Sequence, residues 1–151
     1  IMAEAYHKSP YSASTNGGRW NPSGSRMIYA SSDPAVAQLE YLCINGNGVA
    51  IGLWHMIVFE IANEQLSGTL DPASLPVDWA ALPHSKSTQS FGKLWLDEKE
   101  YPFLRVPTAR LNLKFYPNQF NLLINPDYPD VANLLKVREI IPFQFLVNKI
   151  K

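Results

Sequence analysis

The sequence predicts an α+β fold, in which a mixed, largely antiparallel sheet is accompanied by a few short helices. Helical and strand-like segments follow one another without the regular alternation that a parallel sheet requires. In the second half of the chain, most links between strand-like segments are short enough for hairpins. The chain has 151 residues and shows neither an internal repeat nor a linker, so we expect one domain over residues 1–151.

The first predicted elements are a strand and a capped helix. Residues 26–31 form a β-branched and aromatic run, which predicts a strand. Asp33 suits the N-cap and Pro34 the first helical position, so we expect a helix from there to about Cys43. The NGNG segment at residues 45–48 then ends the helix, because glycine accepts the left-handed C-cap conformation.

The rest of the chain combines one strong strand, a long loop, a second helix and several short strands. Both faces of residues 49–62 are mainly apolar, which predicts a strand in the middle of its sheet. Residues 63–83 predict a long loop with a helical turn at 78–82, and loops of this length are often functional lids. Residues 87–97 carry apolar side chains at helical spacing. Further strands are expected at residues 103–106, 109–114, 120–124 and 140–146, and a helical piece at 131–136.

Composition limits the classes of function. Hydrophobic residues make up 46% of the chain and charged residues 17%, which is typical of a globular protein. Because 13 basic residues balance 13 acidic ones, we expect no basic surface for nucleic acid or an anionic membrane. The sequence has no apolar run long enough to span a membrane and no signal peptide. We therefore predict a cytoplasmic protein without a nucleic-acid partner.

The cysteine and histidine residues predict no metal site. The single cysteine, Cys43, excludes an internal disulfide, and its place on the predicted helix indicates a small core residue. The histidines, His7, His55 and His84, are scattered rather than placed at ligand spacing. His55 lies in the apolar strand and is expected to be at least partly buried.

Glu40 is the most informative residue of the first predicted helix. Its neighbours three and four positions away are all apolar: Val36, Ala37, Cys43 and Ile44. The carboxylate would then face the interior or a cleft, where an unpaired charge is strongly unfavourable, so a cation or polar ligand should meet it. Arg19, on a loop that opens with Gly17 and Gly18, is the nearest candidate in sequence. Alternatively, Glu40 lies at the border of the apolar stripe and simply reaches water.

Six separated segments carry a resemblance to a known family. GGRWNPSG, IYAS and DPAVAQLE lie within residues 17–40, and GKLWL, LRVPTA and NLLINPDYPD lie within residues 92–130. In this order they resemble the RES domain family, which is named for its Arg, Glu and Ser. The resemblance implies a fold related to ADP-ribosyltransferases and a bacterial toxin that consumes NAD, by phosphorolysis, by hydrolysis or by ADP-ribosyl transfer to a protein. It also implies an Xre-type helix-turn-helix antitoxin that covers the active site.

The resemblance assigns roles residue by residue. The family's Arg, Tyr and Glu fall on Arg19, Tyr29 and Glu40, which are the expected catalytic residues. The family's Ser falls on Thr108, which keeps the hydroxyl and adds a methyl group. The chain departs from the family at two places: the segment before Gly17 is short for the usual strand, and the final residues read PFQFLVNKI instead of carrying an Asp and an Arg.

These residue types suit cleavage of the nicotinamide–ribose bond, which passes through an oxocarbenium-like state. Glu40 would stabilise that positive charge and bind the ribose hydroxyls. Arg19 would hold the pyrophosphate through forked, charge-assisted hydrogen bonds. Tyr29 would stack on nicotinamide or donate to the ribose. The expected NAD-binding residues beside them are Trp20, Thr108 and Asn121.

Two other classes of function are considered. A degenerate relative would bind a nucleotide or a partner protein without chemistry, and tight NAD binding without product would identify it. A nuclease toxin that uses His and Arg is disfavoured by the neutral net charge and the scattered histidines.

Overall fold

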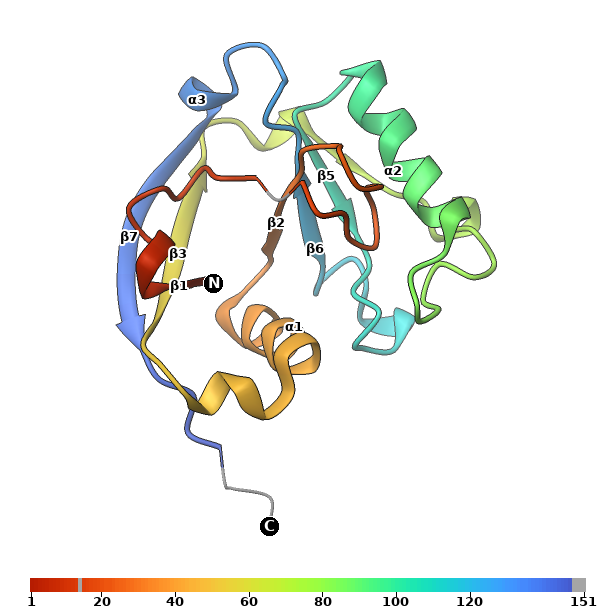
Figure 1. Cartoon of the computed structure of the whole chain (residues 1–151). Helices are drawn as coiled ribbons and strands as arrows, with labels where there is room; N and C mark the ends of the chain where they lie inside the picture. Colours follow the sequence, from red (N-terminus) through yellow and green to blue (C-terminus); the bar gives the residue numbers. More distant parts are fainter. Residues whose placement is uncertain (14, 148–151) are drawn as a thin grey trace.

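The structure, a computed structural model, describes residues 1–13 and 15–147 (Figure 1). The predicted domain over residues 1–151 also includes residues 14 and 148–151, which lie outside the described part. The strands are β1 (Met2–Ala3), β2 (Ile28–Ser31), β3 (Trp54–Ile61), β4 (Ser67–Thr69), β5 (Phe103–Val106), β6 (Asn121–Ile124) and β7 (Leu135–Phe143). The α-helices are α1 (Pro34–Asn45), α2 (Lys86–Glu98) and α3 (Val131–Leu134).

The strands form two sheets. The first has the order β1-β3-β7, with both pairs antiparallel, so β3 is central as the sequence predicts. The second has the order β2-β6-β5-β4, in which only the β4–β5 pair is parallel. The predicted α+β class with a mixed, largely antiparallel arrangement is confirmed. The likeness to ADP-ribosyltransferases stays a prediction.

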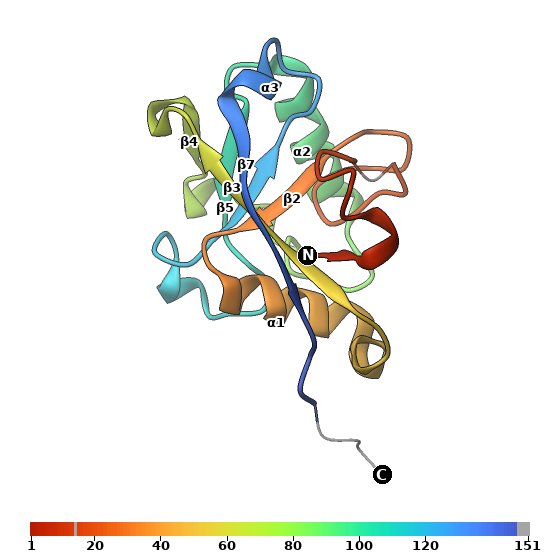
Figure 2. The same ribbon diagram turned by 90° about the vertical axis from the view of Figure 1, so that its left-hand side faces the viewer.

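The second sheet separates two apolar clusters. Because successive side chains of a strand point to opposite faces, Leu104 and Leu123 join the cluster that contains Trp95 of α2. Phe103 and Ile124 belong to the other cluster, which reaches β3 and β7. Figures 1 and 2 show α2 on the face of the second sheet that is turned away from β3 and β7. The second sheet is therefore the middle layer of the molecule.

Helix α1 begins as the sequence predicts. The Asp33 carboxylate accepts hydrogen bonds from the backbone N–H groups of Ala35 at 2.9 Å and Val36 at 3.0 Å. Pro34 is the first helical residue, where its missing N–H has no cost. The helix ends at Gly46, as predicted, although Gly46, with a φ of +52° and a ψ of −135°, does not adopt the left-handed helical conformation that was expected of it. Since α1 directly follows β2, Glu40 is placed beside the sheet edge where β2 ends.

Several predicted strands and helices have different bounds, among them the strand predicted at 140–146, which is observed as β7 (Leu135–Phe143). Residues 109–114 do not form a strand, because the Asn112 side chain accepts from Lys114 N at 3.0 Å and turns the chain into a short 3-10 helix. The helical piece predicted at 131–136 stops at Leu134, since Leu135 already pairs with Ile61 in β7. The strand predicted at 49–62 begins only at Trp54, after the 3-10 turn at Gly46–Ala50.

Two further predictions are wrong and one is confirmed. The loop predicted at 63–83 contains β4, which pairs with β5, and such a three-residue strand leaves little sequence signal. Cys43 is exposed rather than buried, because the apolar stripe of α1 faces solvent in its last turn, where Ile44 is 69% exposed. His55 is buried, as predicted, and stacks on His7 with ring centroids 4.2 Å apart.

Candidate active site

Three side chains donate hydrogen bonds to the carboxylate of Glu40. Thr108 Oγ1 donates to Oε1 at 2.5 Å, and Asn121 Nδ2 donates to the same oxygen at 2.6 Å. Arg110 Nε donates to Oε2 at 3.1 Å and forms an ion pair. The Glu40 side chain is 21% exposed. The expectation that a cation and polar groups meet this carboxylate is confirmed, the cation is Arg110 rather than Arg19, and the alternative that Glu40 simply reaches water is wrong.

Thr108 and Asn121 are themselves held in place. Thr108 is 3% exposed and lies two residues beyond β5, where its hydroxyl also accepts from Arg110 N at 3.1 Å. Asn121 opens β6 opposite Ser31 of β2, and its Oδ1 accepts from Ser31 Oγ at 2.9 Å. Thr108 and Asn121 thus each have a second hydrogen-bond partner, which fixes the direction of the carboxylate before any ligand binds.

Arg19 lies on a tight loop that a second loop covers. Gly17 has a φ of +85°, and a Cβ on Gly18 would come within 2.8 Å of the Tyr29 hydroxyl, so both positions require glycine. Arg19 Nη1 donates to the carbonyl oxygens of Trp79 at 2.6 Å and Ala81 at 3.1 Å. Nη2 is buried and has no hydrogen-bond partner in the described part of the chain. Arg19 therefore ties the loop before α2 to this site.

Charge links Arg19 to Glu40 and Arg110. Burial lowers the pKa of Arg19 below its usual value, the positive charge of Arg110 lowers the pKa further, and Glu40 and Tyr29 oppose the shift. The structure therefore places the predicted Arg19 and Glu40 in one electrostatic environment, although no direct hydrogen bond between them is found among the described residues.

Tyr29 anchors the loop that carries Arg19. Its hydroxyl donates to Asn21 Oδ1 at 2.5 Å and accepts from Trp20 N at 3.1 Å. Burial of the hydroxyl end raises the pKa of Tyr29, so the phenol stays neutral. The hydroxyl proton of Tyr29 is already donated to Asn21 Oδ1, although Tyr29 as a whole is 38% exposed. Of the two predicted roles, donation to ribose loses its donor, and stacking of the ring on nicotinamide stays a prediction.

Comparison with known proteins assigns the family. The sequence pattern of the RES domain matches residues 2–146. The chain belongs to the RES domain family. The resemblance of the six segments is thereby confirmed, and Arg19, Glu40 and Thr108 all fall within the matched region.

Curated relatives of this RES domain are named as toxins. A protein of Sphingobium sp. (strain YBL2) named "Prs ADP-ribosylating toxin" is 34% identical over 140 residues, which cover 91% of this chain and 83% of the relative. A protein of Yersinia enterocolitica named "Toxin Res" is 29% identical over 135 residues, which cover 89% and 85%. A "Toxin Res" of Pseudomonas putida is 26% identical over 137 residues, which cover 83% and 82%.

Sequence reasoning missed two titratable residues near Glu40. The first is Arg110. It follows Thr108 by two positions, and a threonine hydroxyl often accepts a hydrogen bond from the backbone N–H two positions on, so this spacing could have indicated Arg110. The second is His84, which no spacing rule connects to the site. Burial lowers the pKa of His84 below 6.5, and the charges of Arg19 and Arg110 lower the pKa further, while Glu40 opposes them. The imidazole is therefore neutral at pH 7.

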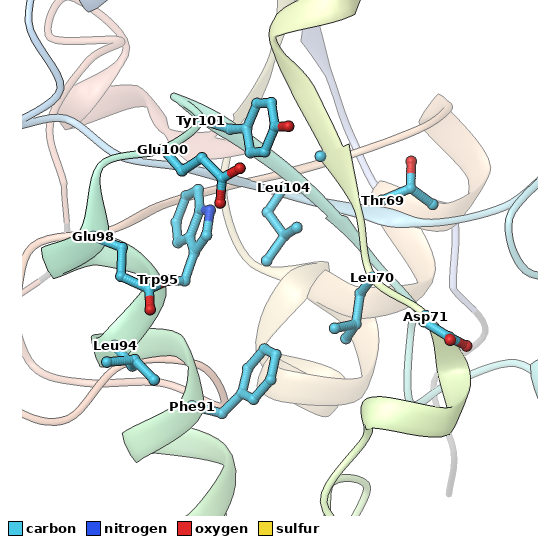
Figure 3. Close-up of a pocket in the computed structure, with 11 residues that line it drawn as sticks. Thr69, Leu70, Asp71, Phe91, Leu94, Trp95, Glu98, Glu100, Tyr101 and Leu104 are labelled. Carbon is cyan, nitrogen blue, oxygen red and sulfur yellow. The ribbon is translucent and has the colours of Figure 1, made fainter.

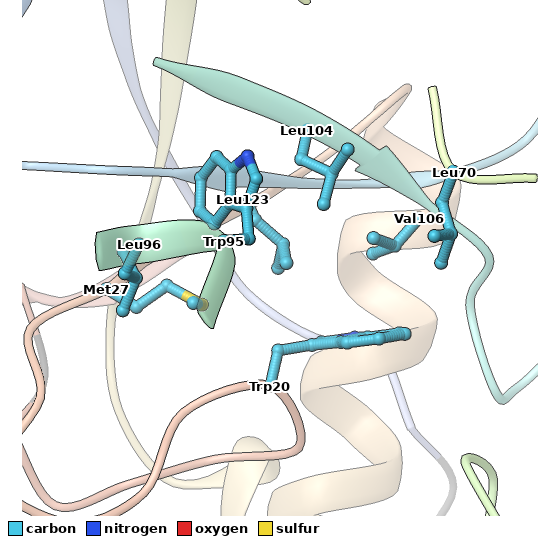
Figure 4. Packing of buried hydrophobic residues seen from close by; sticks show 8 residues of the cluster. All are labelled: Trp20, Met27, Leu70, Trp95, Leu96, Leu104, Val106 and Leu123. Carbon is cyan, nitrogen blue, oxygen red and sulfur yellow. The ribbon is translucent and has the colours of Figure 1, made fainter. Parts of the chain in front are cut away.

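Trp20 packs in the core instead of lining the space beside Glu40. It is 1% exposed and stacks on Trp79 with ring centroids 6.4 Å apart. Figure 4 shows its indole facing Val106 and Leu123. Because Trp20 is buried in this cluster, it anchors the Arg19 loop to the core. Its predicted contact with NAD has no support in this arrangement.

A separate cavity borders the apolar cluster that contains Trp20. It has a volume of about 340 Å³ and is lined by residues that include Leu70, Phe91, Trp95 and Leu104 (Figure 3). Glu40, Arg19 and Arg110 are not among its lining residues. Among the described residues, no group of three or more His, Cys, Asp or Glu could hold a metal ion. No described helix is long and apolar enough to cross a membrane.

Proposed function

We propose that this RES domain is a toxin that consumes NAD by breaking the bond between nicotinamide and ribose. The main support is the environment of Glu40, a carboxylate held by Thr108, Asn121 and Arg110 with the charge of Arg19 nearby. The Sphingobium relative, which is named an ADP-ribosylating toxin, supports NAD as the substrate, because NAD is the donor in ADP-ribosylation.

In the proposed reaction, the bond between ribose C1′ and the nicotinamide nitrogen breaks, and its electron pair leaves with nicotinamide, which becomes neutral. Positive charge then develops on the ribose, as in glycoside cleavage. Among the described residues, Arg110 alone donates to Glu40 Oε2, so this oxygen can accept another hydrogen bond from a ribose hydroxyl. A carboxylate that is already fixed stabilises the ribose cation without reorganisation. An oxygen of the acceptor finally attacks C1′ and releases its proton.

The acceptor in this proposal is a protein side chain, as the name of the Sphingobium relative suggests. Phosphate and water would give phosphorolysis and hydrolysis at the same carbon, so the three reactions share one site and differ only in the attacking oxygen. The toxin names of the relatives also support a protein that silences this activity. We propose an Xre-type antitoxin that covers the space beside Arg19 and Glu40, and its coexpression should prevent depletion of NAD.

The second candidate is a binding module without chemistry. The ion pair between Glu40 and Arg110 favours it, because the cation offsets part of the negative charge that the ribose cation needs. Tight binding of NAD without any product over a long incubation would support this reading.

The deciding experiment is proton NMR of NAD incubated with purified protein, with and without phosphate. The parent protein and the variant Glu40→Gln are compared. Glutamine keeps the size of the side chain, and it can still accept from Arg110, while Asn121 can turn its amide to match. Glu60→Gln is the matched control, since Glu60 is an exposed carboxylate that pairs with Arg138 in the other sheet.

Release of nicotinamide by the parent and by Glu60→Gln, but not by Glu40→Gln, is the expected result when a cell extract supplies protein acceptors. Dependence on phosphate would identify phosphorolysis. If Glu40→Gln consumes NAD at the parental rate, Glu40 is not the essential carboxylate and the proposal is wrong. Unchanged NAD in every sample, repeated with a cell extract as a source of protein acceptors, would leave the binding module as the better description.

A further inference from the structure

Arg110 uses only one of its donor groups on Glu40. The guanidinium carries five N–H groups, and the Nε group alone contacts the carboxylate, at 3.1 Å. Within residues 1–13 and 15–147, the terminal nitrogens of Arg110 have no hydrogen-bond partner. These terminal nitrogens are not fully buried, and the Arg110 side chain keeps 16% of its surface exposed. The four N–H groups of the terminal nitrogens therefore have no partner in the described part of the chain and keep some exposed surface, on the same guanidinium that contacts Glu40.

Arg19 differs from Arg110 in this respect. Its Nη1 is shared between the carbonyl oxygens of Trp79 and Ala81, and its Nη2 is buried. Arg19 would have to release the covering loop before it could offer two parallel N–H groups to a ligand. In the state described here, Arg19 fastens the loop and contributes charge, whereas Arg110 has the accessible fork.

The charges around Glu40 favour an anionic ligand. The cations Arg19 and Arg110 face one carboxylate, and His84 is neutral at pH 7 because burial and both cations lower its pKa. These four groups together therefore carry one net positive charge, although the whole chain is neutral. Phosphate oxygens match the planar fork of a guanidinium better than other common anions of similar size, apart from carboxylates.

We propose that Arg110 binds the pyrophosphate of the dinucleotide, and that Arg19 is a positioning residue that holds the Trp79–Ala81 segment over the site. The inference rests on NAD being the substrate. Arg110 then touches Glu40 through Nε and the phosphate through its terminal nitrogens at the same time. Because the nicotinamide ribose is joined directly to the pyrophosphate, this bridge brings that ribose to Glu40.

The test measures binding of ADP-ribose, which carries the pyrophosphate but no nicotinamide and cannot react. Loss of Arg110 alone would also leave Glu40 without its cation, so the comparison is made in the Glu40→Gln background, where that pairing role is gone. The Kd of Glu40→Gln for ADP-ribose is the reference value of this comparison. Adding Arg110→Gln should weaken the Kd about tenfold to hundredfold, the effect of lost hydrogen bonds between charged groups. Arg138→Gln, which removes an exposed arginine of the other sheet, should leave the Kd unchanged.

A kinetic measurement separates binding from folding. Arg110→Lys keeps a cation for Glu40 but loses the fork, so the KM for NAD should rise about tenfold while kcat changes little. Equal ADP-ribose affinity with and without Arg110 in the Glu40→Gln background would overturn the inference, even if the parent releases nicotinamide from NAD. If the parent neither binds ADP-ribose nor releases nicotinamide, the proposed function and this inference both fail.

Discussion

Replacement of Thr108 tests whether its hydroxyl does the work that the family assigns to serine. Thr108→Val keeps the shape of the side chain and removes the hydroxyl, whereas Thr108→Ser keeps the hydroxyl and removes a methyl group. The hydroxyl donates to Glu40 Oε1 at 2.5 Å and accepts from Arg110 N at 3.1 Å. Valine therefore loses one bond to a carboxylate and leaves one backbone N–H without its partner.

The structure gives the size of the expected effect. A hydrogen bond to a charged group contributes about 1.5–3 kcal/mol, so Thr108→Val should lower the free energy of unfolding by about 2–3 kcal/mol. For a domain of this length that corresponds to a fall in Tm of roughly 4–12 °C. Thr108→Ser removes a single methyl group from a residue that is 3% exposed, which costs about 1 kcal/mol.

The assay combines urea unfolding with nicotinamide release from NAD. We expect Thr108→Ser to keep at least a third of the parental kcat, because the bond to Glu40 persists. Thr108→Val should reduce kcat about tenfold to hundredfold, since Glu40 loses one of the two bonds that fix Oε1. A Val variant with parental kcat and stability would refute the reasoning, because Glu40 would then be held without Thr108.

Three further predictions concern the surroundings of the site. Gly92→Ala would place a Cβ 1.8 Å from Trp20 O, so α2 must shift, and urea unfolding should show a loss of about 1–3 kcal/mol. Tyr29→Phe removes the hydroxyl that binds Trp20 N and Asn21 Oδ1. It should lower the free energy of unfolding by about 1–3 kcal/mol and also reduce the rate of nicotinamide release. The lowered pKa of His84 means that its contribution to stability is complete above pH 6.5 and is lost as the pH falls through the folded value, so His84→Gln should flatten the acid side of the stability profile.

Each of these predictions has a contradicting result. Parental stability of Gly92→Ala would mean that α2 does not pack closely against the Trp20 backbone. Full activity of Tyr29→Phe would mean that the Arg19 loop needs no anchor. A profile of His84→Gln that parallels the parent between about pH 5 and pH 7.5 would show that His84 does not feel the two arginines.

The elements that carry the site could be predicted because their signals are local. An Asp followed by Pro marks the start of α1, and the structure has that cap at Asp33. The bounds predicted for β5, residues 103–106, are those observed, and α2 (Lys86–Glu98) extends the predicted helix by one residue at each end. Each signal lies within a few neighbouring residues, where propensity and capping act directly.

The surroundings of single side chains could not be predicted in the same way. Helical periodicity placed Cys43 in the core, although only tertiary packing decides how far along α1 the apolar face is covered. A sequence also gives no reason to place His84 near Glu40, because the loop that carries His84 is held by Arg19 through backbone carbonyl groups, which every residue has. Contacts to backbone atoms leave no residue-specific pattern.

The cation that meets Glu40 shows which information was missing. Glu40 is separated by 68, 70 and 81 positions from Thr108, Arg110 and Asn121, whereas Arg19 is much nearer in the sequence. Strand order decides the outcome: Ser31 at the end of β2 pairs with Asn121 at the start of β6, and α1 follows β2 directly. Residues beside the start of β6 therefore meet α1, including those just beyond its antiparallel neighbour β5. Strand pairing is therefore a better guide than distance along the sequence to the partner of a half-buried carboxylate. By that criterion Arg110 is a better candidate than Arg19.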